Sequence, residues 1–116
     1  MPKGSDEEKA ARTAAIDAAT RNAIEVPFRV MQASLDSMEV IKKMAEIGNP
    51  ASASDAGVGA LCARAAVRGA YLNVKINTAD LNDATYVSEK LSAGQGMVEQ
   101  ADALEAEILT LVDAAK

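Results

Sequence analysis

The sequence predicts an all-α protein, an antiparallel bundle of long helices with about four helical segments. Apolar residues recur at spacings of three and four along most of the chain, as they do on one face of an α-helix. No stretch alternates apolar and polar residues in the way that a half-buried strand would. Two short stretches, "GNP" at 48–50 and "NTADLND" at 77–83, interrupt the helical pattern. With 116 residues, the chain is expected to form a single helical domain over residues 1–116.

The first helical segment begins with a capping signal and contains a proline. In "SDEE", Ser5 is expected to cap the helix and Glu8 to reach back to it. Small residues then recur at helical spacing as far as Ala23. Pro27 has no N–H and clashes with the carbonyl of residue 23. We therefore expect a kink or break within a few residues of Pro27, or a helix-to-helix turn there.

Three further segments follow. The second covers residues 28–47 and ends at the "GNP" stretch. The third is expected to run from about Ser54 to Asn77, with Ser54 as its N-cap and Asp55 in its first turn, where the helix dipole favours an anion. The apolar ladder of the second segment is Phe28, Met31, Leu35, Met38, Ile41, Met44 and Ile47. The apolar face of the final helix carries Val87, Leu91, Gly94, Val98, Ala101, Ile108, Val112 and Ala115.

The composition predicts a homodimer or a larger assembly. Hydrophobic residues make up 49% of the chain, but aromatic residues make up only 3%, and tryptophan is absent. A core built from Ala, Val, Ile, Leu and Met buries little area per residue. Two long helices with apolar ladders therefore leave surface that one small core cannot cover.

Charge and residue usage exclude several classes of function. The net charge of −5 argues against binding to nucleic acid. No apolar run approaches the length of a membrane span, and "MPKGSDEEKAAR" lacks the apolar core of a signal peptide. Cys62 is the single cysteine, which fits a reducing cytosol, so we expect a cytoplasmic protein. Because histidine is absent, we expect no metal site.

The third segment has one basic face and one face with almost no side-chain bulk. The basic stripe comprises Arg64, Arg68, Tyr71 and Lys75. The opposite face comprises Asp55, Cys62, Ala66 and Asn73, flanked by Gly59, Gly69 and Asn77. Such a face either packs closely against another helix or leaves a groove whose polar ends hold a ligand. Asp55 and Asn73 are five turns apart, about 27 Å. Both can reach one small reacting centre only if a symmetry mate brings a second helix across.

Four short motifs follow one another with a specific spacing. They are "EVP" at 25–27, "GNP" at 48–50, "SDAGVGA" at 54–60 and "GAYLNVKIN" at 69–77. Their order and spacing resemble the cyclodeaminase/cyclohydrolase family, and the resemblance covers nearly the whole chain. This family includes the helical domain joined to formiminotransferase in animals and a bacterial methenyltetrahydrofolate cyclohydrolase. Family domains are nearly twice as long, so the chain resembles the C-terminal portion of a longer cyclodeaminase-like domain.

The resemblance implies a role in folate one-carbon metabolism. The family either eliminates ammonia from 5-formiminotetrahydrofolate or opens and closes the 5,10-methenyl ring with water. Both reactions need proton transfer and stabilisation of charge near an amidine-like cation. Neither needs a metal or a tightly bound cofactor. The chain is expected to be such an enzyme or an inactive fragment of one. The alternative is a non-catalytic helical module that forms homo-oligomers and keeps only the fold.

By the same resemblance, Asp55 and Ser54 are the candidate catalytic residues. The Asp55 carboxylate suits the cation, and Ser54 is a hydrogen-bonding neighbour. Capping of the helix would explain both residues equally well.

The candidate substrate-binding residues are Gly57, Gly59, Asn73 and Asn77. Each glycine destabilises a helix by up to about 1 kcal/mol relative to alanine, so we expect a folate ring or a neighbouring helix close by. The amide of Asn73 can donate and accept, which matches the edge of a pterin. Alternatively, Asn73 bonds a backbone carbonyl across a tight helix contact. The stripe of Arg64, Arg68 and Lys75 either contacts the anionic glutamate tail of folate or forms a solvated face.

Overall fold

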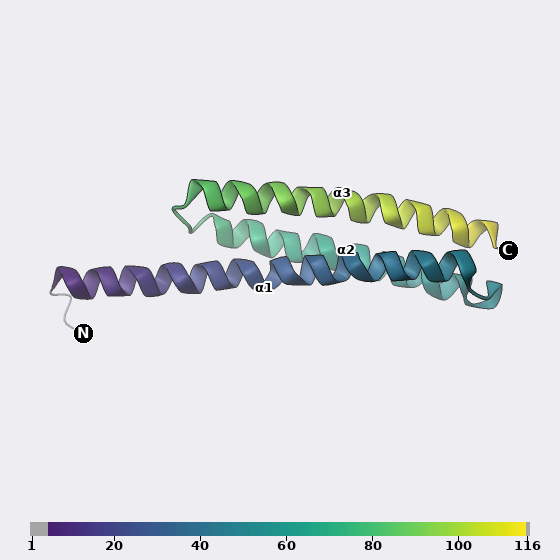
Figure 1. The fold of residues 1–116 in the computed structure, drawn as a ribbon, viewed down its shortest axis with the longest axis horizontal. Helices are drawn as coiled ribbons and strands as arrows, with labels where there is room; N and C mark the ends of the chain where they lie inside the picture. Colours follow the sequence, from purple (N-terminus) through teal and green to yellow (C-terminus); the bar gives the residue numbers. More distant parts are fainter. Residues whose placement is uncertain (1–4, 116) are drawn as a thin grey trace.

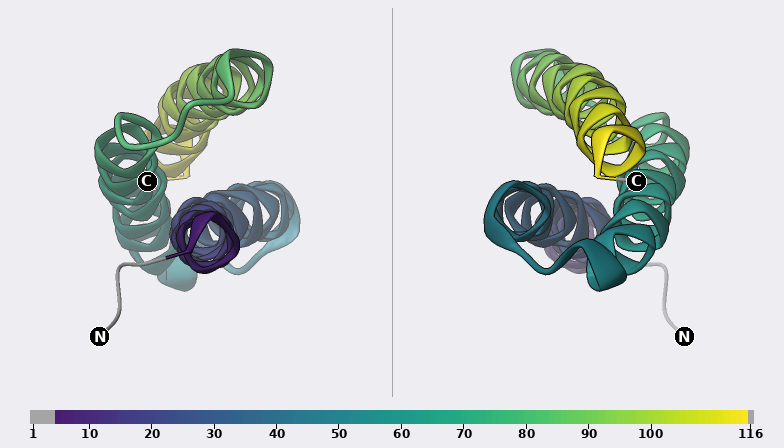
Figure 2. Two further views of the ribbon diagram at one scale, coloured as in Figure 1. Left: turned by 90° about the vertical axis from the view of Figure 1, so that its left-hand side faces the viewer. Right: turned by 90° about the vertical axis from the view of Figure 1, so that its right-hand side faces the viewer.

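Three long α-helices and one short 3₁₀ helix make up the fold. The computed structural model describes residues 5–115. The elements are α1 (Asp6–Ile47), η1 (Pro50–Ser52), α2 (Ala53–Thr78) and α3 (Ala84–Ala114). The helices run antiparallel in chain order along a molecule of 70 × 24 × 16 Å (Figure 1). Viewed end-on, they lie at the corners of a triangle (Figure 2). The described residues contain no strand, which confirms the all-α fold, but they form three long helices where four segments were predicted.

The predicted break at Pro27 is wrong, because α1 continues through this proline as one helix of 42 residues. Figure 1 shows no sharp change of direction along α1. The carbonyl of Ala23 is the one that a residue with an N–H at position 27 would bond. Here it accepts a hydrogen bond of 3.1 Å from Nδ2 of Asn77 on α2. This donor from a neighbouring helix offsets the bond that the proline removes.

Side-chain caps define three of the four helix starts. Ser5 Oγ accepts from the N–H of Glu8 at 3.0 Å, as predicted from "SDEE". Asn49 Oδ1 accepts from the N–H of Ala51 at 2.9 Å and so begins η1. Because η1 leads directly into α2, the cap position of α2 is Ser52, whose side chain makes no capping bond. The prediction that Ser54 is the N-cap is therefore wrong.

The core forms where all three helices meet. Its largest fully buried side chains are Ile24, Met31, Met38, Val67, Val74 and Ile108. Tyr71 of α2 crosses to α3, where its hydroxyl donates to the Leu91 carbonyl at 2.9 Å. Its ring lies against Gly94, at which an added Cβ would come within 2.7 Å of the ring atom Cδ1. The predicted apolar face of the final helix is thus confirmed as the face that meets α2.

The apolar ladder predicted for residues 28–47 is only partly buried. Met31 and Met38 are fully buried, whereas Met44 and Ile47 are 59% and 79% exposed. Helical steps of three residues advance by about 300° each, so three successive steps turn the ladder by about 180°. The steps from Met38 to Ile47 are all of this kind, and they carry the ladder from the core to the opposite face.

The first turns of α1 extend beyond the other two helices. Figure 1 shows this end of α1 projecting past the turn between α2 and α3. Every residue from 5 to 16 is exposed. The small residues of this overhang therefore lie in solvent.

The large apolar side chains that remain exposed within residues 5–115 all lie on α1 and α2. They are Ile16, Val26, Val30, Val40, Met44, Ile47, Val58, Leu61, Leu72 and Ile76. No helix in this described part of the chain is both long and apolar enough to cross a membrane. The large exposed apolar side chains are therefore concentrated on α1 and α2.

Candidate functional site

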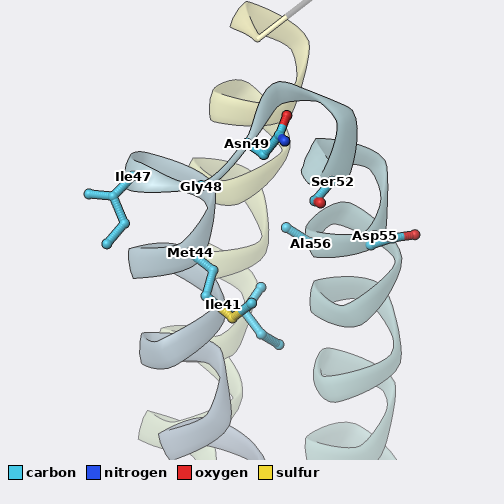
Figure 3. A pocket seen from close by; sticks show the side chains of 8 residues that line it. All are labelled: Ile41, Met44, Ile47, Gly48, Asn49, Ser52, Asp55 and Ala56. Carbon is cyan, nitrogen blue, oxygen red and sulfur yellow. The ribbon is translucent and has the colours of Figure 1, made fainter.

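A first hollow of about 530 Å³ lies where α1 turns into α2. It is lined by Ile41, Met44, Ile47, Gly48, Asn49, Ser52, Asp55 and Ala56. In Figure 3, Ile41 and Met44 point into the space between the two helices, whereas the carboxylate of Asp55 points away from α1. Asp55 is exposed and sits at the rim of this largely apolar hollow. Ser54 is also exposed but does not line the hollow.

A second hollow of about 580 Å³ lies farther along the same pair of helices. Its lining comprises Ala23, Val26, Pro27 and Val30 of α1 with Ala66, Gly69, Ala70, Asn73 and Asn77 of α2. Asn77 Nδ2 donates to the carbonyl of Ala23 at 3.1 Å and to that of Asn73 at 3.0 Å. The amide of Asn73 is exposed and faces this groove without a hydrogen bond to the described protein. The contact across helices that was considered for Asn73 is therefore made by Asn77.

The two hollows do not merge into one site. Gly59 lies between them, where an added Cβ would be 3.4 Å from Cδ1 of Ile41 on α1. Asp55 and Asn73 share one face of α2 but are separated by 18 residues, about 27 Å of helix. A single copy of the chain therefore does not bring these two residues together.

The two glycines of the "SDAGVGA" motif are accounted for by neighbouring helices. Gly57 is buried, and a Cβ there would lie 3.5 Å from Val112 and 3.6 Å from Leu109, both on α3. Gly59 faces α1 through Ile41. A folate ring or a neighbouring helix was expected beside these glycines. At both positions the structure shows a neighbouring helix.

The basic stripe faces α3 and is largely occupied by ion pairs. Arg64 Nε lies 2.9 Å from one oxygen of Asp102, and Arg68 Nη2 lies 2.7 Å from the other. The hydrogen bonds from Arg68 and then Arg64 hold the pKa of Asp102 below its ordinary value. The Lys75 ammonium lies 5.1 Å from the centre of the Tyr71 ring. These contacts place the stripe on the α3 side of α2, away from the groove that Asn73 lines.

A polar cluster between α1 and α3 was not expected from the sequence. Glu25, the first residue of the "EVP" motif, accepts from the Tyr86 hydroxyl at 2.6 Å and from Lys90 Nζ at 3.0 Å. The Lys90 ammonium also lies 4.0 Å from the centre of the Phe28 ring, and the Arg21 guanidinium lies 4.7 Å from that of Tyr86. The sequence shows Arg29 four residues after Glu25, which is the spacing of a local pair on a helix surface. The true partners are more than 60 residues away, and no local pattern marks them.

This cluster predicts a stability that depends on pH in two ranges. Hydrogen bonds from Lys90 and Tyr86 lower the pKa of Glu25 from its ordinary 4.5. The ionised Glu25 therefore stabilises the folded state fully above pH 4.5, and this stabilisation is lost as the pH falls through the lowered pKa. Burial and the bond to Glu25 raise the pKa of Tyr86 from 10.0 to about 12. The protonated Tyr86 therefore stabilises the folded state fully below pH 10, and this stabilisation is lost as the pH rises through about 12.

Phenolate absorbance and thermal unfolding measured across pH would check both ranges. In the wild-type chain we expect a tyrosine titration at about pH 12 that is absent from Tyr86→Phe. Glu25→Gln should flatten the acid limb of the stability curve and lower the pKa of Tyr86. An unchanged Tyr86 titration in Glu25→Gln would show that the carboxylate is not its partner.

Metal ligands are not gathered in the described residues. Between residues 5 and 115, no three His, Cys, Asp or Glu side chains are placed to hold a metal ion. The amide of Asn73 faces the second hollow, and Asp55 lies at the rim of the first. Such groups can orient a neutral heterocycle through hydrogen bonds and stabilise a nearby cation.

Comparison with known proteins gives consistent matches. The sequence profile of the family described as formiminotransferase-cyclodeaminase matches residues 1–96. The chain is 38% identical to a methenyltetrahydrofolate cyclohydrolase of Methylorubrum extorquens, over 97% of this chain and 54% of that protein. It is 34% identical to the formimidoyltransferase-cyclodeaminase of Gallus gallus, over 97% of this chain and 21% of that protein. The chain thus spans about half or less of the length of these relatives. It belongs to the formiminotransferase-cyclodeaminase family.

Proposed function

We propose that this chain functions in folate one-carbon metabolism and binds a tetrahydrofolate derivative in the groove between α1 and α2. The observation that carries the proposal is the meeting of two sequence motifs in the second hollow. Pro27 of "EVP" and Asn73 and Asn77 of "GAYLNVKIN" line it together, although they are about 50 residues apart in the chain. The names of the relatives, a methenyltetrahydrofolate cyclohydrolase and a formimidoyltransferase-cyclodeaminase, support a folate ligand.

The groove suits one end of a folate molecule. Its volume of about 580 Å³ lies within the range of small-molecule sites, about 300–1,000 Å³. Val26 and Val30 supply an apolar wall, and Gly69 leaves open space because a Cβ there would meet no atom within 4 Å. The Asn73 amide offers both a donor and an acceptor to a pterin edge. Asn77 holds this wall in place through its bonds to Ala23 and to the Asn73 carbonyl.

The proposed chemistry is the hydrolysis of a 5,10-methenyl group or the elimination of ammonia from a 5-formimino group. In the first reaction, water adds to the carbon between the two nitrogens, a base accepts its proton, and one carbon–nitrogen bond then breaks. Asp55 is the proposed carboxylate for the proton transfer and for stabilising the cation, with Ser54 beside it. This chemistry uses no metal and no tightly bound cofactor. The relatives extend beyond the matched region, so the whole reaction is proposed for the assembled protein.

Calorimetric titration with 5-formyltetrahydrofolate, a stable folate, would test the proposal. We expect Asn73→Ala to weaken binding by about tenfold or more, because an amide that makes two hydrogen bonds contributes about 1–3 kcal/mol. Asp55→Asn should keep most of the affinity but lower turnover of 5,10-methenyltetrahydrofolate by a factor of about 10²–10⁴.

Asn82→Ala provides a matched control. Asn82 is an exposed asparagine in the turn between α2 and α3, outside both hollows. The control should bind like the wild-type chain. If the folded wild-type chain showed no binding at millimolar 5-formyltetrahydrofolate, the folate proposal would be wrong and the alternative of a non-catalytic assembly module would take its place.

A further inference from the structure

The side-chain amide of Asn77 is held in one orientation at the wall of the second hollow. Its Nδ2 group donates to two backbone carbonyls, that of Ala23 at 3.1 Å and that of Asn73 at 3.0 Å. An amide nitrogen carries two hydrogens, so both are committed. If the amide were turned over, Oδ1 would face the same two carbonyl oxygens with no hydrogen between them. The contacts therefore exclude the reverse orientation.

The proline of the "EVP" motif makes this orientation possible. In a regular helix the N–H of residue 27 would donate to the Ala23 carbonyl. Because Pro27 has no N–H, this carbonyl lacks its usual donor, and Asn77 donates to it from α2. Pro27, Ala23 and Asn77 all line the second hollow. The hydrogen bond that the proline removes from α1 is thus replaced at the wall of this hollow.

The polar atom that Asn77 leaves for a ligand is its side-chain oxygen, Oδ1. Within residues 5–115, no group donates a hydrogen bond to this oxygen. It is also not among the side-chain atoms of these residues that are buried without a partner, so it is accessible from outside. An amide oxygen accepts hydrogen bonds and donates none. Asn77 therefore offers the hollow an acceptor only.

Asn73 differs from Asn77 in this respect. Its side chain is exposed and has no hydrogen-bond partner in the described part of the chain, so its amide can turn to donate or to accept. Asn73 precedes Asn77 by four residues, which makes the two side chains neighbours on α2, with about 5–6 Å between their Cβ atoms. The second hollow thus combines one adaptable amide with one fixed acceptor.

The charges around the second hollow favour a neutral donor over an anion. None of the residues that line it is charged. Asn77 lies in the last turn of α2, where unpaired carbonyls make the end of the helix dipole negative. Lys75, the basic residue of this turn, lies beside the Tyr71 ring, on the side that faces α3. A carboxylate in the hollow would be repelled, whereas the N–H group of a neutral ring would be attracted.

From these contacts we infer that Asn77, fixed by Pro27, is a specificity-determining residue that selects a ligand with an N–H donor on its ring. The identity of the ligand rests on the proposed function. In a reduced folate this donor is N3–H of the pterin, which would donate to Asn77 Oδ1. The oxygen on the adjacent carbon, C4, would accept from the amide of Asn73. The pterin, and not the glutamate tail, therefore occupies the second hollow.

Two ligands that differ only at this edge would test the selection. They are 5-formyltetrahydrofolate and its 4-amino analogue, in which an amino group replaces the C4 oxygen and N3 carries no hydrogen. N3 of the analogue would oppose Asn77 Oδ1, acceptor against acceptor, whereas Asn73 could turn to accept from the new amino group. In calorimetric titrations we expect the wild-type chain to bind the parent compound at least tenfold more tightly than the analogue. Equal binding of the two would overturn the inference and leave the folate proposal standing.

Two variants of α1 separate the orientation of Asn77 from the shape of the hollow. In Pro27→Ala, the new N–H competes for the Ala23 carbonyl, so the Asn77 amide can turn over. We expect the preference for the parent compound to fall to about threefold or less. Val26→Ala also removes bulk from the hollow but leaves that carbonyl unchanged, so it should weaken both compounds by the same factor. An undiminished preference in Pro27→Ala would overturn the role of the proline.

Exchange of the side-chain amide hydrogens would test the orientation without a ligand. By NMR, we expect the Nδ2 hydrogens of Asn77 to exchange with water at least tenfold more slowly than those of the exposed Asn82 in the folded wild-type chain. Pro27→Ala should bring the rate at Asn77 closer to that at Asn82. Equally fast exchange at both residues in the wild type would overturn the fixed orientation. Slow exchange in a chain that bound neither compound would support the fixed acceptor and remove the folate function.

Discussion

Replacing Gly94 with alanine is expected to destabilise the fold by about 2 kcal/mol, within the range of about 1–3 kcal/mol for overpacking a core. The new Cβ would lie well inside contact distance of the Tyr71 ring, 2.7 Å from Cδ1. The ring cannot turn away easily, because Tyr71 is 8% exposed and its hydroxyl is bonded to the Leu91 carbonyl. Urea unfolding followed by circular dichroism would measure the loss.

Gly96→Ala is the matched control for this prediction. Gly96 is in the same helix, but nothing lies within 4 Å of its added Cβ. Alanine there should stabilise the protein by about 0.5–1 kcal/mol through helix propensity alone. Two substitutions of the same kind, two residues apart, should therefore have opposite signs. Stabilisation by both would mean that the Tyr71 ring does not occupy the space beside Gly94.

Removing the side chain of Asn77 is expected to cost about 1–2 kcal/mol of the free energy of unfolding. The Ala23 carbonyl would lose its donor, and Pro27 supplies no N–H in its place. Because the bond is partly buried, water replaces it only incompletely. Thermal unfolding of Asn77→Ala would measure the effect.

The double variant with Pro27→Ala shows whether the bond to Ala23 is the cause. An alanine at position 27 provides the N–H that a regular helix directs to the Ala23 carbonyl. In the Pro27→Ala background, Asn77→Ala should lower the free energy of unfolding by less than half as much as it does in the wild-type chain. The coupling energy between the two positions should be about 1 kcal/mol. Additive effects would show that Asn77 acts through some other contact.

Local signals predicted most of the fold. The cap at Ser5, the stop at Gly48 and the turn after Asn77 are each determined by a few adjacent residues, and the helices begin and end close to these points. The continuity of α1 at Pro27 was not predictable in this way. It depends on a hydrogen-bond donor from another helix, Asn77, which lies 50 residues after Pro27 in the chain. The local effect of proline on a helix takes no account of such a distant donor.

The candidate site shows the same division between local and distant causes. Helical periodicity alone set Asp55 and Asn73 on one face of α2, and both line hollows in the α1–α2 groove. Helical periodicity could not show that Arg64 and Arg68 are paired with Asp102, because Asp102 lies on another helix. Glu25 was missed for the same reason, since its partners Tyr86 and Lys90 come from α3.

The overhang of α1 has a consequence for how this long helix opens. Residues 5–16 are all exposed, so only the cap at Ser5, the acidic first turn and the intrinsic helix propensity of alanine hold them helical. Between Ile24 and Met38, the buried side chains of α1 pack into the shared core, which protects the backbone amides of this part of the helix. Hydrogen exchange along α1 should therefore change from fast local fraying to slow exchange that requires global unfolding. One uninterrupted helix thus contains two regimes of motion, and the boundary between them is set by where the neighbouring helices begin.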